Sequence, residues 1–495
     1  MTLQTTPITS TERSRWLALI VLCAGFLMIV LDQTIVNVAL PAIQNDLGFT
    51  QSSLAWVVNA YLIAFGGLLL LAGRIGDLIG RKRVFLFGLA VFTLASLACG
   101  VSTTREMLIV SRFVQGIGGA MTSAVTLGMI VTLFREPREQ AKAIGIYSFV
   151  ASAGASIGLL AGGVLTQALN WHWIFFVNLP IGIAAAVLAS RLLEHDEGVG
   201  LGEGADVTGA ALVTGGLMLG VYAIVGAADH GWSSASTLGL GGVALALLVG
   251  FVARQATAAN PLLPLRLFRT RNLWAANVVQ VLMVGGLFGM FFSGSLYLQR
   301  VRNFGPVEIG LAFLPVAIAI GTLSLGFSAR LMNRYGARAV MVPGLVLIVV
   351  GLLLLVRVPV ESSYVVDLLP SMVLFGVGAG LAFPVLVTVA MSGATPSDSG
   401  VASGLVNTTQ QVGGALGLAI LATLATSRSN RLLAGGDDLP SALTSGYQLG
   451  FAVAAGAVVA AVIIAAAVLR PQPATEPEPV TFGSEQPQAA DAISN

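Results

Sequence analysis

The sequence predicts an all-α integral membrane protein, and three observations support this fold class. Of the 495 residues, 56% are hydrophobic. Only 10% are charged, whereas soluble domains carry about 25%. The apolar residues are gathered in runs of about 20 residues, the length that a helix needs to cross a bilayer. Such a chain cannot cover its surface with polar groups, so we expect it to be a multi-pass membrane protein.

Fourteen apolar runs are expected to form transmembrane helices. The first six cover 16–40, 52–72, 84–101, 107–134, 142–166 and 173–193. Two more follow a short acidic segment and cover 207–228 and 236–254. The last six cover 272–299, 307–330, 339–356, 367–391, 401–426 and 447–469. Although Arg13 and Arg15 precede the first run, it is too long for a signal peptide and has no small-residue cleavage site, so we expect a retained helix.

Positive charge sets the expected orientation. Of the 25 Lys and Arg residues, 18 fall on the side of the amino terminus and 6 on the opposite side, and Arg112 lies within a helix. Because positive charge marks the cytoplasmic face, both termini are expected in the cytoplasm. The segment from Pro471 onward is rich in Pro, Glu and Gln and is expected to be disordered.

An internal repeat predicts how the fourteen helices are grouped. An offset of 256 aligns the loop 73–82 with 329–338, so that Gly80 meets Gly336. Offsets of 259 and 260 align further glycines of the two halves. A six-helix unit fills less than this period, and the helices of 207–254 account for the difference. Two parallel halves around a central path are a recurring transporter design.

The expected domain organisation follows from the repeat. Two pseudo-symmetric six-helix bundles flank a linker that contains two inserted helices. The expected parts are a cytoplasmic tail at 1–15, a bundle at 16–193, the linker at 194–256, a bundle at 257–470 and a disordered cytoplasmic tail at 471–495.

Two ionisable residues lie deep within the expected helices, Asp32 in the first and Arg112 in the fourth. Each costs several kcal/mol unless it is paired or hydrated, so a functional role is the default hypothesis. Helix rise places them at depths that an arginine side chain can bridge. We expect Asp32 to bind and release a proton beside Arg112. The alternative is a static structural ion pair.

Two further patterns predict conformational change. Asp77 lies among Arg74, Arg81 and Lys82 at a loop between helices, where it can bind a helix amino terminus or basic groups in one conformation only. This loop is expected to act as a latch. Small residues one helical turn apart let two helices approach closely, so that they can slide past each other. The alternative is close packing without movement. The fifth expected helix carries such a set at Gly154, Gly158, Gly162 and Gly163.

Several motifs resemble the major facilitator superfamily, in particular its fourteen-spanner drug:proton antiporter family. The likeness covers LDQTIVNVALP from Leu31, WVVNAY from Trp56, the loop residues Gly73, Asp77, Gly80, Arg81 and Lys82, RFVQGIGGA from Arg112, and WHWIFFVNLPIG from Trp171. The resemblance implies proton coupling by Asp32, Arg112 and Gln115. The glycines of the fifth helix match the family's antiporter motif, but Leu159 replaces its usual proline.

The resemblance implies a monomeric transporter of the bacterial plasma membrane that exports lipophilic or amphipathic drugs in exchange for protons. Expected substrate contacts between the halves are Met121, Phe288, Phe291 and Phe292. Uptake or exchange of a small metabolite is an alternative, and a receptor or scaffold is an alternative outside transport. Since export is driven by the proton gradient, no cofactor or metal is expected.

Other function classes fit the sequence poorly. The net charge of +2 comes from scattered basic residues, which argues against a nucleic-acid partner. The three histidines lie in or near loops and form no HExxH motif, and no glycine-rich phosphate loop is present. We therefore expect neither an enzyme nor an ATP-driven pump.

Overall fold

A computed structural model describes residues 12–469 except 135, 195, 197, 199, 201–205, 260, 264, 267–270 and 392–398. Every regular element in these described ranges is a helix. The expected tails lie largely outside them, but Glu12–Arg15 already belong to the first helix. Lipid offers no hydrogen-bond partners to the backbone. A helix suits such surroundings because it satisfies its backbone hydrogen bonds internally.

The helices follow one another in this order. The first group is α1 (Glu12–Leu47), α2 (Gln51–Leu54), α3 (Trp56–Ile79), α4 (Arg81–Gly100), α5 (Arg105–Leu133), α6 (Pro137–Ala168), α7 (Trp173–Phe176) and α8 (Asn178–Leu192). A pair follows, α9 (Val207–His230) and α10 (Ala235–Thr257). The last group is α11 (Arg271–Arg300), α12 (Pro306–Thr322), η3 (Leu323–Phe327), α13 (Ser328–Tyr335), α14 (Ala337–Leu355), η4 (Tyr364–Leu368), α15 (Leu369–Met391), α16 (Ser399–Ala434) and α17 (Leu439–Val468). We call these groups the first half, the hairpin and the second half.

Twelve spans in the described part of the chain are long and apolar enough to cross a membrane. They correspond to twelve of the fourteen expected helices. Two shorter apolar helices, Ile157–Ala168 within α6 and Pro306–Thr322, lie where the other two were expected.

Several expected boundaries were wrong. The first helix continues to Leu47 and includes Pro41, rather than ending at Leu40. The second expected helix is divided into α2 and α3 and extends to Ile79. The sixth is divided at Val177, and Pro180 lies in the first turn of α8, where proline costs no intrahelical hydrogen bond. The tenth contains a π-helical turn, η3.

The repeat is visible in the backbone. Gly80 and Gly336, aligned by the offset of 256, both adopt positive φ, 101° and 84°, at the corner between two helices. An L side chain rarely adopts such values, so glycine is favoured at both corners. The glycines of α5 and α15 also make equivalent contacts: Gly118 packs against α4, and Gly378 packs against α14.

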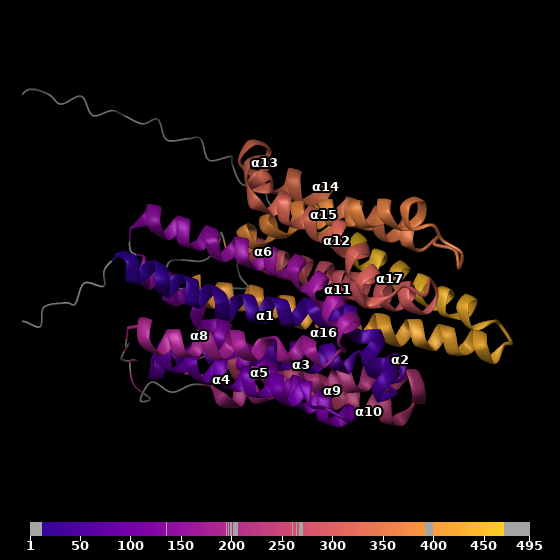
Figure 1. The fold of residues 1–495 in the computed structure, drawn as a ribbon, viewed down its shortest axis with the longest axis horizontal. Helices are drawn as coiled ribbons and strands as arrows, with labels where there is room; N and C mark the ends of the chain where they lie inside the picture. The colour runs from indigo at the N-terminus through magenta and orange to yellow at the C-terminus, as the bar shows by residue number, and fades with distance from the viewer. Residues whose placement is uncertain are drawn as a thin grey trace, which may run out of the picture.

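The helices run back and forth along the long axis of the molecule (Figure 1). We call the end at which α1 begins the Glu12 end and the opposite end the Leu47 end. The hairpin lies at the edge of the bundle, where α9 contacts α3 and α16. The ring of Trp56 in α3 lies 6.2 Å from the tilted ring of Tyr222 in α9, and the Thr423 hydroxyl of α16 donates to Ile224 O. The hairpin thus contacts both halves through α9.

Candidate functional site

Asp32 lies within α1, and its side chain has no exposed surface. Its Oδ2 atom accepts a hydrogen bond of 2.5 Å from Arg112 Nη1 of α5. Its Oδ1 atom accepts from Gln115 Nε2 at 2.8 Å and from Asn178 Nδ2 at 3.1 Å. The carboxyl group is therefore held by donors from two other helices, α5 and α8.

Arg112 is the largest of the fully buried side chains, with 1% of its surface exposed. Besides Asp32, Nη1 donates to Gln115 Oε1 at 2.5 Å, and Nε donates to Val57 O of α3 at 2.9 Å. The guanidinium carbon lies 4.4 Å from the centroid of the Tyr61 ring, a distance that suits a cation–π contact. The structure thus brings together Asp32, Arg112 and Gln115, which the sequence placed in one site.

Three uncharged members of the cluster were missed by the sequence reasoning. Asn178 and Ser96 have no exposed surface, and Ser96 Oγ accepts from Gln115 Nε2 at 2.7 Å. Cys99 Sγ donates to Gln115 Oε1 at 3.6 Å. Asn178 belongs to the quoted WHWIFFVNLPIG segment, which was a usable signal. Ser96 carries none, because serine is common in membrane helices.

This arrangement can exchange a proton. The attraction within an ion pair deep in an apolar bundle offsets the free-energy cost of desolvation only when most of its hydrogen bonds are made. Protonation of Asp32 would remove the negative charge to which three N–H groups of α5 and α8 donate hydrogen bonds. The protonation state of one carboxyl therefore affects the contacts of α1 with both helices.

The expected loop 73–82 is helical apart from Gly80, and it forms the corner between α3 and α4 at the Glu12 end. Asp77 Oδ1 accepts from Arg81 Nη2 at 3.1 Å, so its partner here is a basic side chain rather than a helix amino terminus. Arg81 Nη1 also donates to Gly128 O of α5 at 3.2 Å. Gly73 faces Ala124 of α5. Arg81 and Gly73 thus join this corner to α5.

A second acid, Asp196, was not anticipated at this loop. Its carboxylate accepts from the backbone N–H of Arg81 at 2.6 Å and of Lys82 at 3.1 Å, which are the first two residues of α4. Lys82 Nζ donates to Ser190 O and Leu193 O at the end of α8. Asp196 thus occupies the helix amino terminus next to the loop.

The glycines of α6 face two different partners. A Cβ at Gly154 would contact Leu27 and Val30 of α1, and at Gly158 it would meet Thr34. At Gly162 it would lie 2.7 Å from Ile35 O, also in α1. Gly163 instead faces Pro306 and Val307 of α12, in the second half. This helix therefore packs closely against α1 and against the other half.

The four expected substrate contacts do not form one cluster. Phe288 contacts Gly414 of α16, and Phe291 lies 5.0 Å from the ring centroid of Phe313. Phe292 is 1% exposed within the second half. Met121 lies within the first half, where its Cβ adjoins Gly88 of α4. Phe288 is the one whose neighbours join the halves, because Leu62 of α3 also adjoins Gly414.

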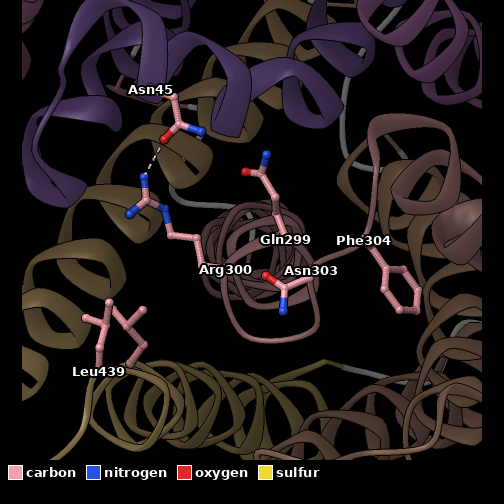
Figure 2. Close-up of a pocket in the computed structure, with 7 residues that line it drawn as sticks. Asn45, Gln299, Arg300, Asn303, Phe304 and Leu439 are labelled. Atoms are coloured by element: carbon pink, nitrogen blue, oxygen red, sulfur yellow. Dashed lines mark hydrogen bonds between the residues drawn. The ribbon is translucent and has the colours of Figure 1, made fainter.

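The halves also meet at the Leu47 end. Figure 2 shows Arg300, at the end of α11, donating to Asn45 Oδ1 of α1 at 3.0 Å. The pair borders a shallow pocket of about 420 Å³ that is also lined by Gln299, Asn303, Phe304, Leu439 and Leu443. Nearby, Val307 N donates to Gln167 Oε1 of α6 at 3.2 Å. Polar contacts thus join the halves at this end.

Comparisons with known proteins agree with this architecture. The profile of the Major Facilitator Superfamily matches residues 22–418. The chain is 39% identical to the puromycin resistance protein pur8 of Streptomyces alboniger, over 89% of this chain and 88% of that protein. It is 38% identical to the cephamycin export protein CmcT of Amycolatopsis lactamdurans, over 85% of this chain and 87% of that protein.

Solved structures share the fold at lower identity. A POT family peptide transporter in an auto-inhibited form has a TM-score of 0.67 at 14% identity, covering 92% of this chain and 98% of that one. An inward-facing, unoccupied bacterial homologue of the human lysosomal transporter Spinster has a TM-score of 0.64 at 17% identity, covering 93% and 97%.

Proposed function

Because the chain belongs to the Major Facilitator Superfamily, we propose that it is a secondary transporter that exports antibiotics or other amphipathic compounds in exchange for protons. The relatives named for puromycin resistance and cephamycin export support this class of substrate. The tetracenomycin C resistance and export protein of Streptomyces glaucescens, 35% identical over 86% of this chain, supports it too.

One observation carries the proton coupling, the buried contact between Asp32 and Arg112. In export, Asp32 would take a proton from the outer side, lose its charge and loosen its bond to Arg112. It would release the proton to the inner side when the path opens there. The gradient supplies the free energy, and the protein needs no cofactor.

The proposed topology has fourteen membrane-spanning helices in a monomer. Its support is the twelve long spans together with α6 and the combined α12, η3 and α13, whose positions match the two remaining expected spans. The first half would be one six-helix bundle and the second half another, with the hairpin inserted between them. Since the sequence predicts 18 of the 25 basic residues on the side of the amino terminus, and α1 begins at the Glu12 end, this end would face the cytoplasm of a bacterial plasma membrane.

Alternating access would involve both ends of the bundle. The contacts Arg300 with Asn45 and Val307 with Gln167 would close the outer end in the present conformation. Opening that end requires these bonds to break. The loop of Gly73, Asp77, Gly80, Arg81 and Lys82 would act at the inner end, where Asp77 exchanges Arg81 for another partner. The α6 glycines would let α6 shift along α1 and α12.

Substrate would pass between the halves near Phe288, Leu62 and Gly414, where α11, α3 and α16 meet. Phe291 and Phe292 lie on the same helix and would extend this apolar surface. Met121 would contribute only if the conformation changes, because it now faces α4.

A susceptibility screen identifies the exported compound. An efflux-deficient bacterial host that expresses the chain should show raised inhibitory concentrations for puromycin or another antibiotic of the panel. A protonophore should abolish the difference. Equal inhibition of hosts with and without the chain across the whole panel would contradict export.

The Asp32→Asn variant tests the coupling. In everted vesicles, proton-driven accumulation of the compound found in the screen should fall to the level of vesicles without the protein. Asp437→Asn is the matched control, because Asp437 is exposed in the loop before α17 and should leave accumulation unchanged. Undiminished accumulation by Asp32→Asn would refute the assignment.

A further inference from the structure

Asn178 is the first residue of α8, and its amide group is fully buried. Nδ2 donates to Asp32 Oδ1 at 3.1 Å and to Ser96 Oγ at 3.4 Å. The other end of the amide, Oδ1, has no hydrogen-bond partner among the described residues. A buried acceptor without a partner is costly, so its retention beside a carboxyl group calls for an explanation.

The two protonation states of Asp32 need different neighbours. A carboxylate only accepts hydrogen bonds, whereas a carboxylic acid also carries an O–H that must donate. Arg112, Gln115 and Asn178 all donate hydrogen bonds to Asp32. Gln115 Oε1 already accepts from Arg112 at 2.5 Å and from Cys99 at 3.6 Å. Ser96 Oγ already accepts from Gln115 and Asn178. Among the described side chains that are hydrogen-bonded to Asp32, the unused acceptor is Asn178 Oδ1.

We infer that Asn178 is a positioning residue for the proton site, whose amide turns by half a rotation to serve both states of Asp32. With the carboxylate, Nδ2 faces Asp32, as observed. After protonation, Oδ1 accepts the new O–H. The amide keeps its own protons, and the only covalent bond formed or broken is the O–H of Asp32. This inference rests on the proposed proton coupling through Asp32.

Packing permits this exchange. The amide oxygen and nitrogen have nearly the same size, so rotation leaves the volume of the side chain unchanged. Ser96 Oγ is a hydroxyl and can either accept from Nδ2 or donate to Oδ1. The contacts with Asp32 and Ser96 therefore remain available in both orientations, and in each orientation the atom that is turned away, Oδ1 or Nδ2, is the one without a partner among the described residues.

The charged surroundings of Asp32 are few. Among the described residues, the titratable groups that face it are Arg112 of α5, Tyr61 of α3 and Cys99 of α4. The titratable groups of α6 that contact α1 are Tyr147, which stacks on Phe26, and Glu139, which pairs with Arg15, and both contacts lie more than one turn from Asp32 along α1. A change at Asn178 therefore acts on a carboxyl group whose other partners stay in place.

Infrared difference spectroscopy of the purified protein in lipid nanodiscs provides the test. A pH step should produce a carboxylic C=O band that is absent in Asp32→Asn. An amide band that is absent in Asn178→Leu should change with the same midpoint, because the amide rotates when Asp32 is protonated. A carboxyl band without any accompanying amide change would overturn the inference.

Substitution gives a second readout. In Asn178→Leu, leucine has a similar volume to asparagine but makes no hydrogen bond. This substitution destabilises the Asp32 carboxylate more than the protonated Asp32, because a hydrogen bond to a charged group is the stronger one. The midpoint of the carboxyl titration and of the transport profile should both rise by about one pH unit. Asn178→Ser keeps a donor and an acceptor on a shorter side chain, so it should raise the midpoint in the same direction by a smaller amount, and it covers the case that Asn178→Leu does not fold.

The control is Asn59→Leu. Asn59 is equally buried and both its amide atoms lack partners among the described residues, yet no hydrogen bond to Asp32 is recorded for it. Its substitution should leave the midpoint unchanged. An equal shift in Asn59→Leu, or none in Asn178→Leu and Asn178→Ser, would overturn the role of Asn178. Proton-coupled transport by Asp32→Asn would instead overturn the proposed function.

Discussion

Arg112 reaches three acceptors with one planar group: Asp32, Gln115 and the Val57 carbonyl. Its guanidinium also lies over Tyr61. These contacts tie α5 to α1 and α3. A compact ammonium has the same charge but cannot present donors in a fixed plane or stack in this way. Shape, as well as charge, therefore fixes the site.

We accordingly predict that Arg112→Lys retains the fold and loses function. Proton-driven export in everted vesicles should fall at least about tenfold, since the loss of one charge-assisted hydrogen bond corresponds to roughly 1.5–3 kcal/mol. Arg105→Lys is the control, because Arg105 is exposed and donates only to Leu47 O among the bonds described. Export by Arg112→Lys at the normal rate would show that charge alone suffices.

Charged members of the site were accessible to sequence reasoning, whereas of the uncharged ones only Gln115 was named, through the resemblance of its motif. Asp32 and Arg112 stand out because ions are rare in apolar runs. Ser96, Tyr61 and Asn178 are unremarkable in a membrane helix until packing brings them together. Asp196 was missed for a similar reason: it caps α4 from a segment more than 100 residues away in sequence. Such partnerships depend on tertiary structure.

Among whole elements, α6 shows how small residues determine helix spacing. Gly158 lies against Leu31 O and Thr34 of α1, and a Cβ there would overlap the Thr34 side chain. We predict that Gly158→Ala destabilises the protein by about 1–3 kcal/mol, the usual cost of overpacking, and slows export. Thermal unfolding in detergent and vesicle transport are the measurements.

Gly456 of α17 is the matched control, because a Cβ there would meet nothing within 4 Å. Gly456→Ala should raise stability slightly, since alanine favours helix by up to about 1 kcal/mol. If both substitutions had the same effect, the close contact of α6 with α1 would not be the cause.

The hairpin is fastened at its Glu12 end by Asp206. This residue caps α9 through Gly209 N and also accepts from Gln255 Nε2 and Arg254 Nε of α10. Burial alone would raise the pKa of Asp206, but these three hydrogen bonds outweigh it and hold the pKa below its usual value. A lowered pKa means that the charged form stabilises the fold at neutral pH. This contribution is lost as the pH falls through the pKa of the folded state.

We predict that Asp206→Ala lowers the Tm at pH 7, by an amount that corresponds to about 1 kcal/mol for a lost helix cap. The difference from the unmodified protein should begin to shrink below about pH 4, near the usual carboxyl pKa of about 3.9, and should be lost once the pH is below the lowered pKa of the folded state, where the carboxyl group is protonated in both states. Asp438→Ala is the comparison, because the exposed Asp438 caps α17 through Ser441 alone, without a basic partner in the described structure, so it should lower the Tm at pH 7 by less than Asp206→Ala. A difference that persists in acid would show that the cap is not electrostatic.

The existence of the helices followed from the sequence, but their breaks did not. Length and hydropathy locate α3 or α11 because a bilayer requires about 20 apolar residues. They do not reveal the division at Val177 or the π-helical turn at 323–327, since both segments are mostly apolar. Local hydrogen bonding, rather than composition, determines these features.

Considering the whole molecule, the repeat indicated two similar halves but not how they meet. The same sequence must support at least two packings if access alternates, so no pattern of residues can specify one of them. In the present conformation α6 packs on α12 and α3 packs on α16. At the Leu47 end the halves are also joined by the bond between Arg300 and Asn45.

These contacts allow a test of alternating access by cross-linking. Asn45 and Arg300 belong to different halves and are hydrogen-bonded, so Asn45→Cys with Arg300→Cys should react with a short bifunctional thiol reagent whose bridge is cleavable. The native cysteines, Cys23 and Cys99, are buried and should react little. Cross-linking would hold the Leu47 end closed, so export should stop and should return when the bridge is cleaved.

The control pair Leu47→Cys with Arg105→Cys lies at the same end but entirely within the first half, since Arg105 Nε donates to Leu47 O at 3.0 Å. Its bridge should leave export largely intact, because the first half moves as a unit if access alternates by rocking of the halves. Export that continues through a fully cross-linked Asn45 and Arg300 pair would mean that the substrate leaves by a route that does not require the halves to separate there. In that case the hydrogen bond in Figure 2 would be a fixed structural contact rather than part of the gate.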